Sequence, residues 1–198
     1  MSPLDIEVPA GTIVALMGPN GAGKSTLMLC LSGLLRPTTG DVWVDGFHLY
    51  RDEIEAKRRI AFVPDVPSFY PELSLWEHLA FVATMHGVGR TVEMRASPLL
   101  QEFGLANVKD ESPVLYSRGM RLKAGFLIAL IRPLSMLLLD EPDAAADSSS
   151  VEALGRHLRR LRSEGAAVLF TTHDTAFASQ MADQIWRMED GRLSRQQE

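Results

Sequence analysis

A glycine-rich stretch with a single lysine, "GPNGAGKST", lies near the start of the 198-residue chain. It fits the pattern G-x-x-x-x-G-K-[ST], in which glycines turn successive backbone N–H groups toward one anion. A helix that begins directly after such a loop directs its positive end to the same place. A glycine turn without a ligand is the alternative interpretation. The stretch predicts a loop for a nucleoside triphosphate, made of Gly18, Pro19, Asn20, Gly21, Ala22, Gly23, Lys24, Ser25 and Thr26.

The lysine and the first hydroxyl of this loop have separate predicted roles. Lys24 places a full positive charge at the outer phosphates, and the hydroxyl of Ser25 is suited to bind Mg²⁺.

Two adjacent acidic residues follow an apolar run in "MLLLDEP". If the run is a buried strand, Asp140 and Glu141 lie at its carboxyl end, where α/β sheets place their ligands. Asp140 is suited to hold Mg²⁺ through water, and Glu141 is a candidate general base that activates an attacking water. The alternative is an acidic pair that only begins a loop.

A histidine follows another apolar run in "FTTHD". His173 is therefore expected at the same edge of the sheet, where we assign it to the γ-phosphate. A single histidine after a strand can also be structural, so that alternative stays open.

The surrounding pattern predicts the elements that position these residues. Leu4, Ile6 and Val8 alternate with acidic residues, which favours a half-buried strand, and "TIVALMG" is typical of a strand covered on both faces. "KSTLMLCLSGLL" predicts a helix that ends near Gly33, "DVWVDG" a hairpin, and "IAFVPD" a short strand.

The chain then becomes helical up to about Ser117. Ser74 and Glu77 form a capping box, and Pro98 should kink or split the helix expected over 91–103. Further predicted elements follow: a helix in "SRGMRLKAGFLIALI", strands in "SMLLLDEP", "AAVLFTTH" and "QIWRME", and a serine-capped helix in "SSSVEALGRHLRRLRSEG".

Strands that alternate with helices indicate an α/β fold with a mostly parallel sheet. We expect a single domain over 1–198 with an inserted helical subdomain over 71–119 and a small antiparallel β part. The net charge of −5 disfavours a nucleic-acid binder. The only cysteine, Cys30, fits a reducing cytosol and is interpreted as a small buried hydrophobic residue.

The order of these motifs resembles the nucleotide-binding domain of an ABC transporter, which has a P-loop NTPase fold. "GPNGAGKST" resembles its Walker A motif, "MLLLDEP" its Walker B motif with the catalytic glutamate at Glu141, and His173 its switch histidine. "YSRGM" falls where the family has its signature and resembles the form found in export systems. The resemblance implies that a signature faces the ATP of the opposite copy through Ser117, Arg118, Gly119 and Met120.

Four departures from the family pattern accompany this resemblance. Arg118 and Met120 stand where the signature usually has glycine and glutamine. Asp65 stands where the Q-loop has glutamine, and it is a predicted Mg²⁺ ligand that is shorter than glutamine and charged. Asp147 takes the place of the D-loop aspartate behind a run of alanines. The family usually begins earlier, with an aromatic residue that stacks on adenine, yet no Tyr, Trp or Phe precedes Gly18. We expect either a start upstream of Met1 or ATP binding mainly through the phosphates.

The resemblance implies an ATP-binding and ATP-hydrolysing subunit of an ABC transporter, with export as the expected direction. Its cofactors would be ATP and Mg²⁺. Its partners would be a membrane-spanning permease and a second ABC ATPase, in a homodimer or heterodimer at the cytoplasmic face of the membrane, without nucleic acid. One alternative is a nucleotide-dependent regulatory module with little turnover. An ABC ATPase of DNA repair or chromosome structure is disfavoured, because the insert is short and lacks heptads.

Overall fold

The computed structural model describes residues 4–145 and 147–195, which divide into two compact units. The sheet unit contains residues up to Phe62, Leu134–Asp143 and the chain from His157 onward. The helical unit contains Val63–Pro133 and Ala144–Arg156. Helix α6 (Ser148–Ser163) begins in the helical unit and ends in the sheet unit.

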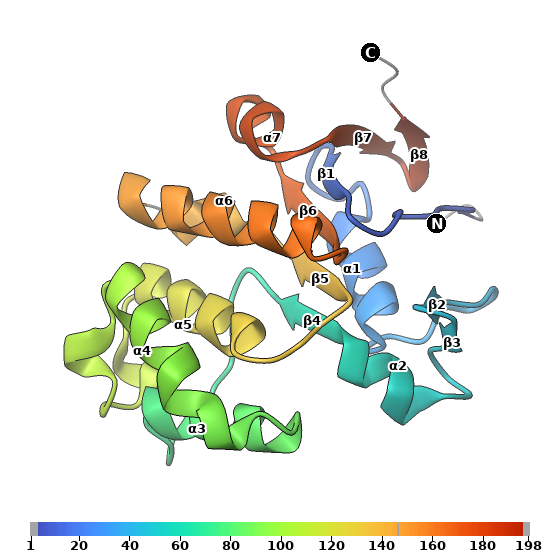
Figure 1. The fold of residues 1–198 in the computed structure, drawn as a ribbon. Coiled ribbons are helices and arrows are strands. Elements are labelled where there is room, and N and C mark those ends of the chain that lie inside the picture. Colours follow the sequence, from blue (N-terminus) through green and yellow to red (C-terminus); the bar gives the residue numbers. More distant parts are fainter. Residues whose placement is uncertain (1–3, 146, 196–198) are drawn as a thin grey trace. The chain divides into compact units, whose positions relative to one another are not determined.

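A six-stranded sheet forms the centre of the sheet unit in the described part of the chain (Figure 1). Its strand order is β4-β5-β6-β1-β7-β8. β1 pairs in parallel with β6 and β7, β5 pairs in parallel with β6, and β8 pairs antiparallel with β7. The predicted mostly parallel sheet is therefore confirmed. The strands are β1 (Ile13–Met17), β4 (Ile60–Val63), β5 (Met136–Leu139), β6 (Ala167–Thr172), β7 (Gln184–Glu189) and β8 (Arg192–Arg195).

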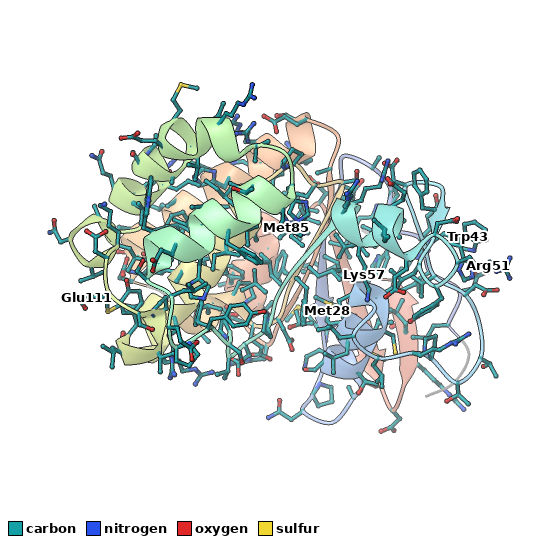
Figure 2. The ribbon with its side chains drawn as sticks, turned by 90° about the horizontal axis from the view of Figure 1, so that it is seen from below. Met28, Trp43, Arg51, Lys57, Met85 and Glu111 are labelled. Atoms are coloured by element: carbon teal, nitrogen blue, oxygen red, sulfur yellow. The ribbon has the colours of Figure 1, made fainter. Side chains whose placement is uncertain are left out.

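The central strands β1 and β6 are mostly apolar, since both faces of the sheet are covered, and β6 ends in the two buried threonines Thr171 and Thr172. Every residue of β1 and of β6 is buried. Met28 of α1 (Lys24–Ser32) and Trp186 of β7 belong to the same core and are almost fully buried. Figure 2 shows Met28 within the sheet unit and Trp43, whose ring is largely exposed, at the edge of that unit.

Helix α1 ends as expected at Gly33, which has a φ of 77°. The predicted hairpin is β2 (Trp43–Val44) and β3 (Phe47–His48), joined by Asp45 and Gly46 with φ values of 52° and 80°. Both turn residues have positive φ, as a tight two-residue hairpin requires.

One expectation for the sheet unit needs correction, and one helix was not predicted. Leu4, Ile6 and Val8 pack partly buried against the core, but the described residues 4–9 form no strand, so the predicted N-terminal strand was wrong. The alternation of apolar and acidic residues indicated which side chains are buried. It did not show whether a neighbouring strand is present to form hydrogen bonds with this segment. Helix α2 (Glu53–Arg59) was not predicted, although it has acidic residues in its first turn and basic residues in its last. The remaining helix of this unit is α7 (Thr175–Met181).

The helical unit contains α3 (Leu75–Met85), α4 (Val92–Glu102) and α5 (Arg118–Leu130), joined by short 3₁₀ turns. Ser74 and Glu77 form the predicted capping box at the start of α3. α4 runs through Pro98 without a break, so a split helix was wrong. The carbonyl of Met94 loses its helical donor there, and Met94 is 75% exposed, where water can replace that bond.

The loop after β4 packs tightly against α5 within the helical unit. A Cβ on Gly125 of α5 would lie 2.9 Å from Cγ1 of Val63 and 3.0 Å from Cγ of Pro67. The absence of a side chain at Gly125 thus lets the loop that contains Asp65 approach the helix that begins after Ser117.

Candidate functional site

The glycine loop joins β1 to α1, as the sequence predicts. Gly18 has a φ of 155°, and a Cβ at this position would lie 2.1 Å from the carbonyl oxygen of Met188 in β7. Gly23, at the cap of α1, has a φ of 105°. Residues with a side chain rarely adopt these conformations, so glycine is required at both positions for the loop to take this path.

The start of α1 has the features of an anion site. Gly23 provides no side-chain cap, and the first helical bond runs from Leu27 N to Gly23 O at 2.9 Å. The N–H groups of Lys24, Ser25 and Thr26 therefore have no helical acceptor. Phosphate oxygens are acceptors of the right charge for such a helix end.

The ammonium group of Lys24 is held inside the loop. Lys24 is 6% exposed, and its Nζ donates to the carbonyl oxygens of Gly18 at 2.7 Å and Pro19 at 3.3 Å. A phosphate in the loop would compete for the same protons with a full negative charge, which makes the stronger hydrogen bond. The loop, its helix and this lysine thus fit a nucleoside triphosphate.

The turn between β7 and β8 supports the loop from the far end of the sequence. Gly191 N donates to Ala22 O at 3.1 Å, and Met188 O lies against Gly18. No sequence signal pointed to this contact, because "DGR" identifies a turn without saying what the turn touches. A cavity of about 220 Å³ beside the loop is lined by Met17, Gly18, Pro19, His173, Thr175, Arg187 and Glu189.

Asp140 and Glu141 follow β5, at the edge of the sheet to which the glycine loop also belongs. Oδ1 of Asp140 accepts a hydrogen bond from the hydroxyl of Thr171 at 2.5 Å, and the same hydroxyl oxygen accepts from Glu141 N at 2.9 Å. Thr171 is fully buried at the end of β6. Glu141 has a φ of 51°, which is unusual for a residue with a side chain.

His173 and Glu141 are in direct contact. Nδ1 of His173 lies 2.8 Å from Oε2 of Glu141, so the tautomer with a proton on Nδ1 donates to the carboxylate. The structure brings together the two residues that the sequence assigned to water activation and to the γ-phosphate. The sequence had no signal for this contact beyond their common edge of the sheet.

Ser25 and Asp140 are the residues of the sheet unit that would hold Mg²⁺. Within the described residues no group of three or more His, Cys, Asp or Glu side chains is arranged to hold a metal ion. Mg²⁺ usually keeps several waters and takes one or two protein carboxylates together with substrate phosphates. The hydroxyl of Ser25 and the carboxylate of Asp140, together with a phosphate-binding loop, fit this coordination preference.

Asp65 belongs to the helical unit and has a different partner. Its Oδ1 pairs with Nη2 of Arg118 at 2.5 Å. The sequence predicts that both residues depart from the family pattern, and in the structure they form an ion pair. A metal role for Asp65 remains a prediction.

The segment predicted to be the signature begins α5. The hydroxyl oxygen of Ser117 accepts from Met120 N at 3.3 Å and caps the helix, and Arg118, Gly119 and Met120 form its first turn. The hydroxyl of Tyr116 donates to Val108 O. Burial, helped by the charges of Glu111 and Asp110, raises the pKa of Tyr116 to about 12.

Asp147, at the D-loop position, is bound within its own chain. Its carboxylate accepts from Nζ of Lys123, from the hydroxyl of Ser149 and from Ser150 N. These donors, with Lys123 first, hold the pKa of Asp147 well below its usual range. Lys123 was not singled out from the sequence, because a lysine inside a predicted helix has no distinguishing pattern.

The fold and the loop define a P-loop NTPase, with a parallel sheet, a glycine loop before α1 and acidic residues after β5. Comparison with known proteins narrows the class. The family model described as ABC transporter matches residues 1–144, and the chain belongs to the ATP-binding cassettes of that family.

Two relatives and one solved structure illustrate the match. The ABC transporter ATP-binding protein YthP of Bacillus subtilis (strain 168) is 36% identical over 190 residues, covering 95% of this chain and 75% of the relative. The lantibiotic transport ATP-binding protein SrtF of Streptococcus pyogenes is 33% identical, covering 96% and 80%. A dimeric post-hydrolysis state of the ATP-binding cassette MJ0796, bound to ADP and Pi, superposes with a TM-score of 0.84 at 27% identity, covering 98% and 89%.

The helices of the described residues were also compared with the length and hydropathy that a bilayer requires. None of them is long and apolar enough to cross a membrane.

Proposed function

We propose that the chain binds and hydrolyses ATP as a subunit of an ABC exporter and drives a separate membrane permease. The observation that carries this proposal is the 2.8 Å contact between His173 Nδ1 and Glu141 Oε2. Because β1, β5 and β6 are parallel, their carboxyl ends meet at one edge, so this pair and the glycine loop share that edge. A base that activates water must work beside the phosphates that the loop holds.

Each residue of this edge has a proposed task. Lys24 and the free N–H groups at the start of α1 hold the phosphates and neutralise charge that develops on them. Glu141 accepts a proton from the attacking water. His173 fixes the carboxylate through Nδ1, and its protonated ring has a second N–H group for a γ-phosphate oxygen. Mg²⁺, held by Ser25 and Asp140, would supply further charge neutralisation when bound.

The same proposal extends to the partners. We propose that two ABC ATPase chains, identical or different, close on two ATP molecules, with Ser117, Arg118, Gly119 and Met120 of one chain facing the ATP of the other. The dimeric structure of the cassette MJ0796 supports this assembly, and a relative named for lantibiotic transport supports export. The chain would act at the cytoplasmic face of the membrane, as one domain over 1–198 in which residues 71–119 form the subdomain that contacts the permease.

The decisive experiment compares Mg-ATP hydrolysis by the purified chain with that of Glu141→Gln. The substitution keeps the size of the side chain and removes the base, so turnover should fall by about 10²- to 10⁴-fold while ATP binding persists. Glu152→Gln is the matched control, because Glu152 is an exposed glutamate on α6. Near-normal turnover in Glu141→Gln contradicts the assignment. ATP binding without turnover in the wild type would instead indicate a nucleotide-dependent regulatory module.

A further inference from the structure

Three consecutive residues, the last two of β6 and the histidine that follows it, each contact one acidic residue in the segment after β5. Thr171 donates to Asp140 at 2.5 Å, and His173 Nδ1 lies 2.8 Å from Glu141. The proposed function uses both of these acidic residues. The third contact, from the hydroxyl of Thr172 to Oδ2 of Asp143 at 2.8 Å, involves a carboxylate to which no role has been given.

The hydroxyl of Thr172 links the carboxylate of Asp143 to the backbone before and after His173. Thr172 is fully buried, and its hydroxyl oxygen also accepts from Asp174 N at 3.0 Å. The carboxylate of Asp174 in turn caps α7 by accepting from Ala176 N at 2.7 Å. The backbone before and after His173 is therefore tied to one buried hydroxyl, whose own proton goes to Asp143.

Within the described residues, the side chain of His173 makes no hydrogen bond other than that with Glu141. It is 71% exposed, whereas that of Glu141 is 23% exposed. Since an exposed ring can rotate freely, its contact with Glu141 depends on where the backbone of this segment lies.

Glu141 needs similar support on the opposite segment. Its φ of 51° persists only where neighbouring contacts over-determine it. Glu141 N is held by Thr171, and two residues later Asp143 is held by Thr172. The strained residue thus lies between two hydrogen bonds to adjacent threonines of β6.

An aspartate side chain is energetically unfavourable at position 143. Its Oδ1 is buried and has no hydrogen-bond partner within the described residues. A buried carboxylate oxygen without a donor destabilises the fold, so the packing of the segment alone does not favour aspartate here. What Asp143 provides in return is a charged acceptor for Thr172, and such an acceptor makes a stronger and more directional hydrogen bond.

We propose that Asp143 is a positioning residue for ATP hydrolysis, which acts through Thr172 to hold His173 and Glu141 in contact. The proposal rests on the proposed function, because it assigns Asp143 to the same reaction. It adds a residue that touches neither the phosphates nor the reacting water.

The first measurement is steady-state ATP hydrolysis by the full chain and four variants. Thr172→Val keeps the shape of the side chain and removes the hydroxyl, Thr172→Ser keeps the hydroxyl, and Asp143→Ala removes the acceptor. We expect kcat to fall by roughly ten- to a hundredfold in Thr172→Val and Asp143→Ala, because a small displacement of reacting groups has effects of this size. KM for ATP should stay unchanged, since the glycine loop is untouched, and Thr172→Ser should keep its kcat. The fourth variant, Thr172→Val with Asp143→Ala, should be no worse than either single variant.

The second measurement does not need turnover. The ring resonances of His173 in ¹⁵N-histidine-labelled chain, identified with His173→Gln, report its hydrogen bond to Glu141, and Glu141→Gln shows where they move when that partner changes. Thr172→Val and Asp143→Ala should move the His173 resonances, and Thr172→Ser should not. The other four of the five histidines show whether the variant is folded.

The two measurements separate the two proposals. If the wild type turns over ATP and Glu141→Gln does not, but Asp143→Ala keeps full kcat, the positioning role is wrong and the proposed function stands. If the wild type does not hydrolyse ATP, the proposed function fails. In that case unmoved His173 resonances in Asp143→Ala overturn the positioning of His173 as well, and moved resonances support it.

Discussion

The two units of the chain hold their functional residues by different kinds of interaction, buried hydrogen bonds in one and an exposed ion pair in the other. In the sheet unit, Thr171 and Thr172 are fully buried, and they connect the acidic residues after β5 to the histidine segment by hydrogen bonds. In the helical unit, Asp65 is held by an ion pair with Arg118, whose side chain is 59% exposed. The first arrangement excludes water and the second is in contact with it.

This difference sets what a substitution costs in each unit. A buried donor or acceptor that loses its partner costs about 1–3 kcal/mol, whereas an exposed ion pair contributes only about 0–1 kcal/mol. Substitutions at these buried contacts of the sheet unit therefore lower the free energy of unfolding more than substitutions in the exposed first turn of α5. Asp65 and Arg118, which pair with each other where both are open to solvent, lie where a change costs little.

The largest loss of folding stability is expected for a substitution at Gly18, because the sheet unit has no space for a side chain at this position. In Gly18→Ala the new Cβ would lie 2.1 Å from Met188 O, so either the loop or β7 must move. Overpacking against backbone together with a positive φ should lower the free energy of unfolding by about 3 kcal/mol or more. Urea unfolding followed by tryptophan fluorescence measures the loss.

Gly40→Ala is the matched control for this prediction. Gly40 has a φ of 90° and nothing within 4 Å of its Cβ position, so it reports the cost of the backbone conformation alone, about 1 kcal/mol. Equal losses in the two variants would show that the contact with β7 contributes nothing.

The second prediction tests whether a buried hydrogen bond in the helical unit also contributes to the free energy of unfolding. In Tyr116→Phe the carbonyl of Val108 loses its donor, and the free energy of unfolding should fall by about 1 kcal/mol. Tyr70→Phe is the control, because Tyr70 is 62% exposed. A loss as small as that of the control would place Tyr116 with the exposed contacts of its unit.

Tyr116 also gives a pH signature with a definite sign. Burial raises the pKa of Tyr116 to about 12, so between the ordinary tyrosine pKa of about 10 and that value the folded state binds more protons than the unfolded state. Stability from this group is complete below pH 10 and is lost as the pH rises toward about 12. Tyr116→Phe should flatten that part of the stability profile, and an unchanged slope would contradict the assignment.

The sequence predicted what depends on local pattern. The glycine loop, the buried strands and the capping box at Ser74 follow from spacing within a few residues, and the structure confirms them. The contact of Gly191 with Ala22 and the pair of Asp65 with Arg118 join segments far apart in the chain, so no local pattern contains them. Long-range packing also decided against the predicted strand near Ile6, whose side chain packs on the core without a ladder partner in the described residues.

A smaller effect is expected for the ion pair between Asp65 and Arg118. Asp65→Asn and Arg118→Gln should each change the free energy of unfolding by less than about 1 kcal/mol, and the double variant should show a coupling of about 0.2–1 kcal/mol. The coupling should shrink in high salt, because both groups are open to solvent. A coupling of the size found in buried networks, or one that salt does not change, would remove the contrast between the two units.

The smallest effect concerns Asp147 and Lys123. Because Lys123 lowers the pKa of Asp147, the pair stabilises the fold above the ordinary aspartate pKa of about 4, and this contribution is lost as the pH falls below that value. Lys123→Met should therefore lower the free energy of unfolding by a few tenths of a kcal/mol at pH 7 and by less at pH 3, since the carboxylate is 52% exposed and the pair is screened. Ser149 and Ser150 N still hold the carboxylate, so part of the acid sensitivity should remain in the variant. If Lys123→Met loses as much stability as Tyr116→Phe, this ion pair is held as firmly as a buried contact, and exposure alone does not decide which contacts of the helical unit matter.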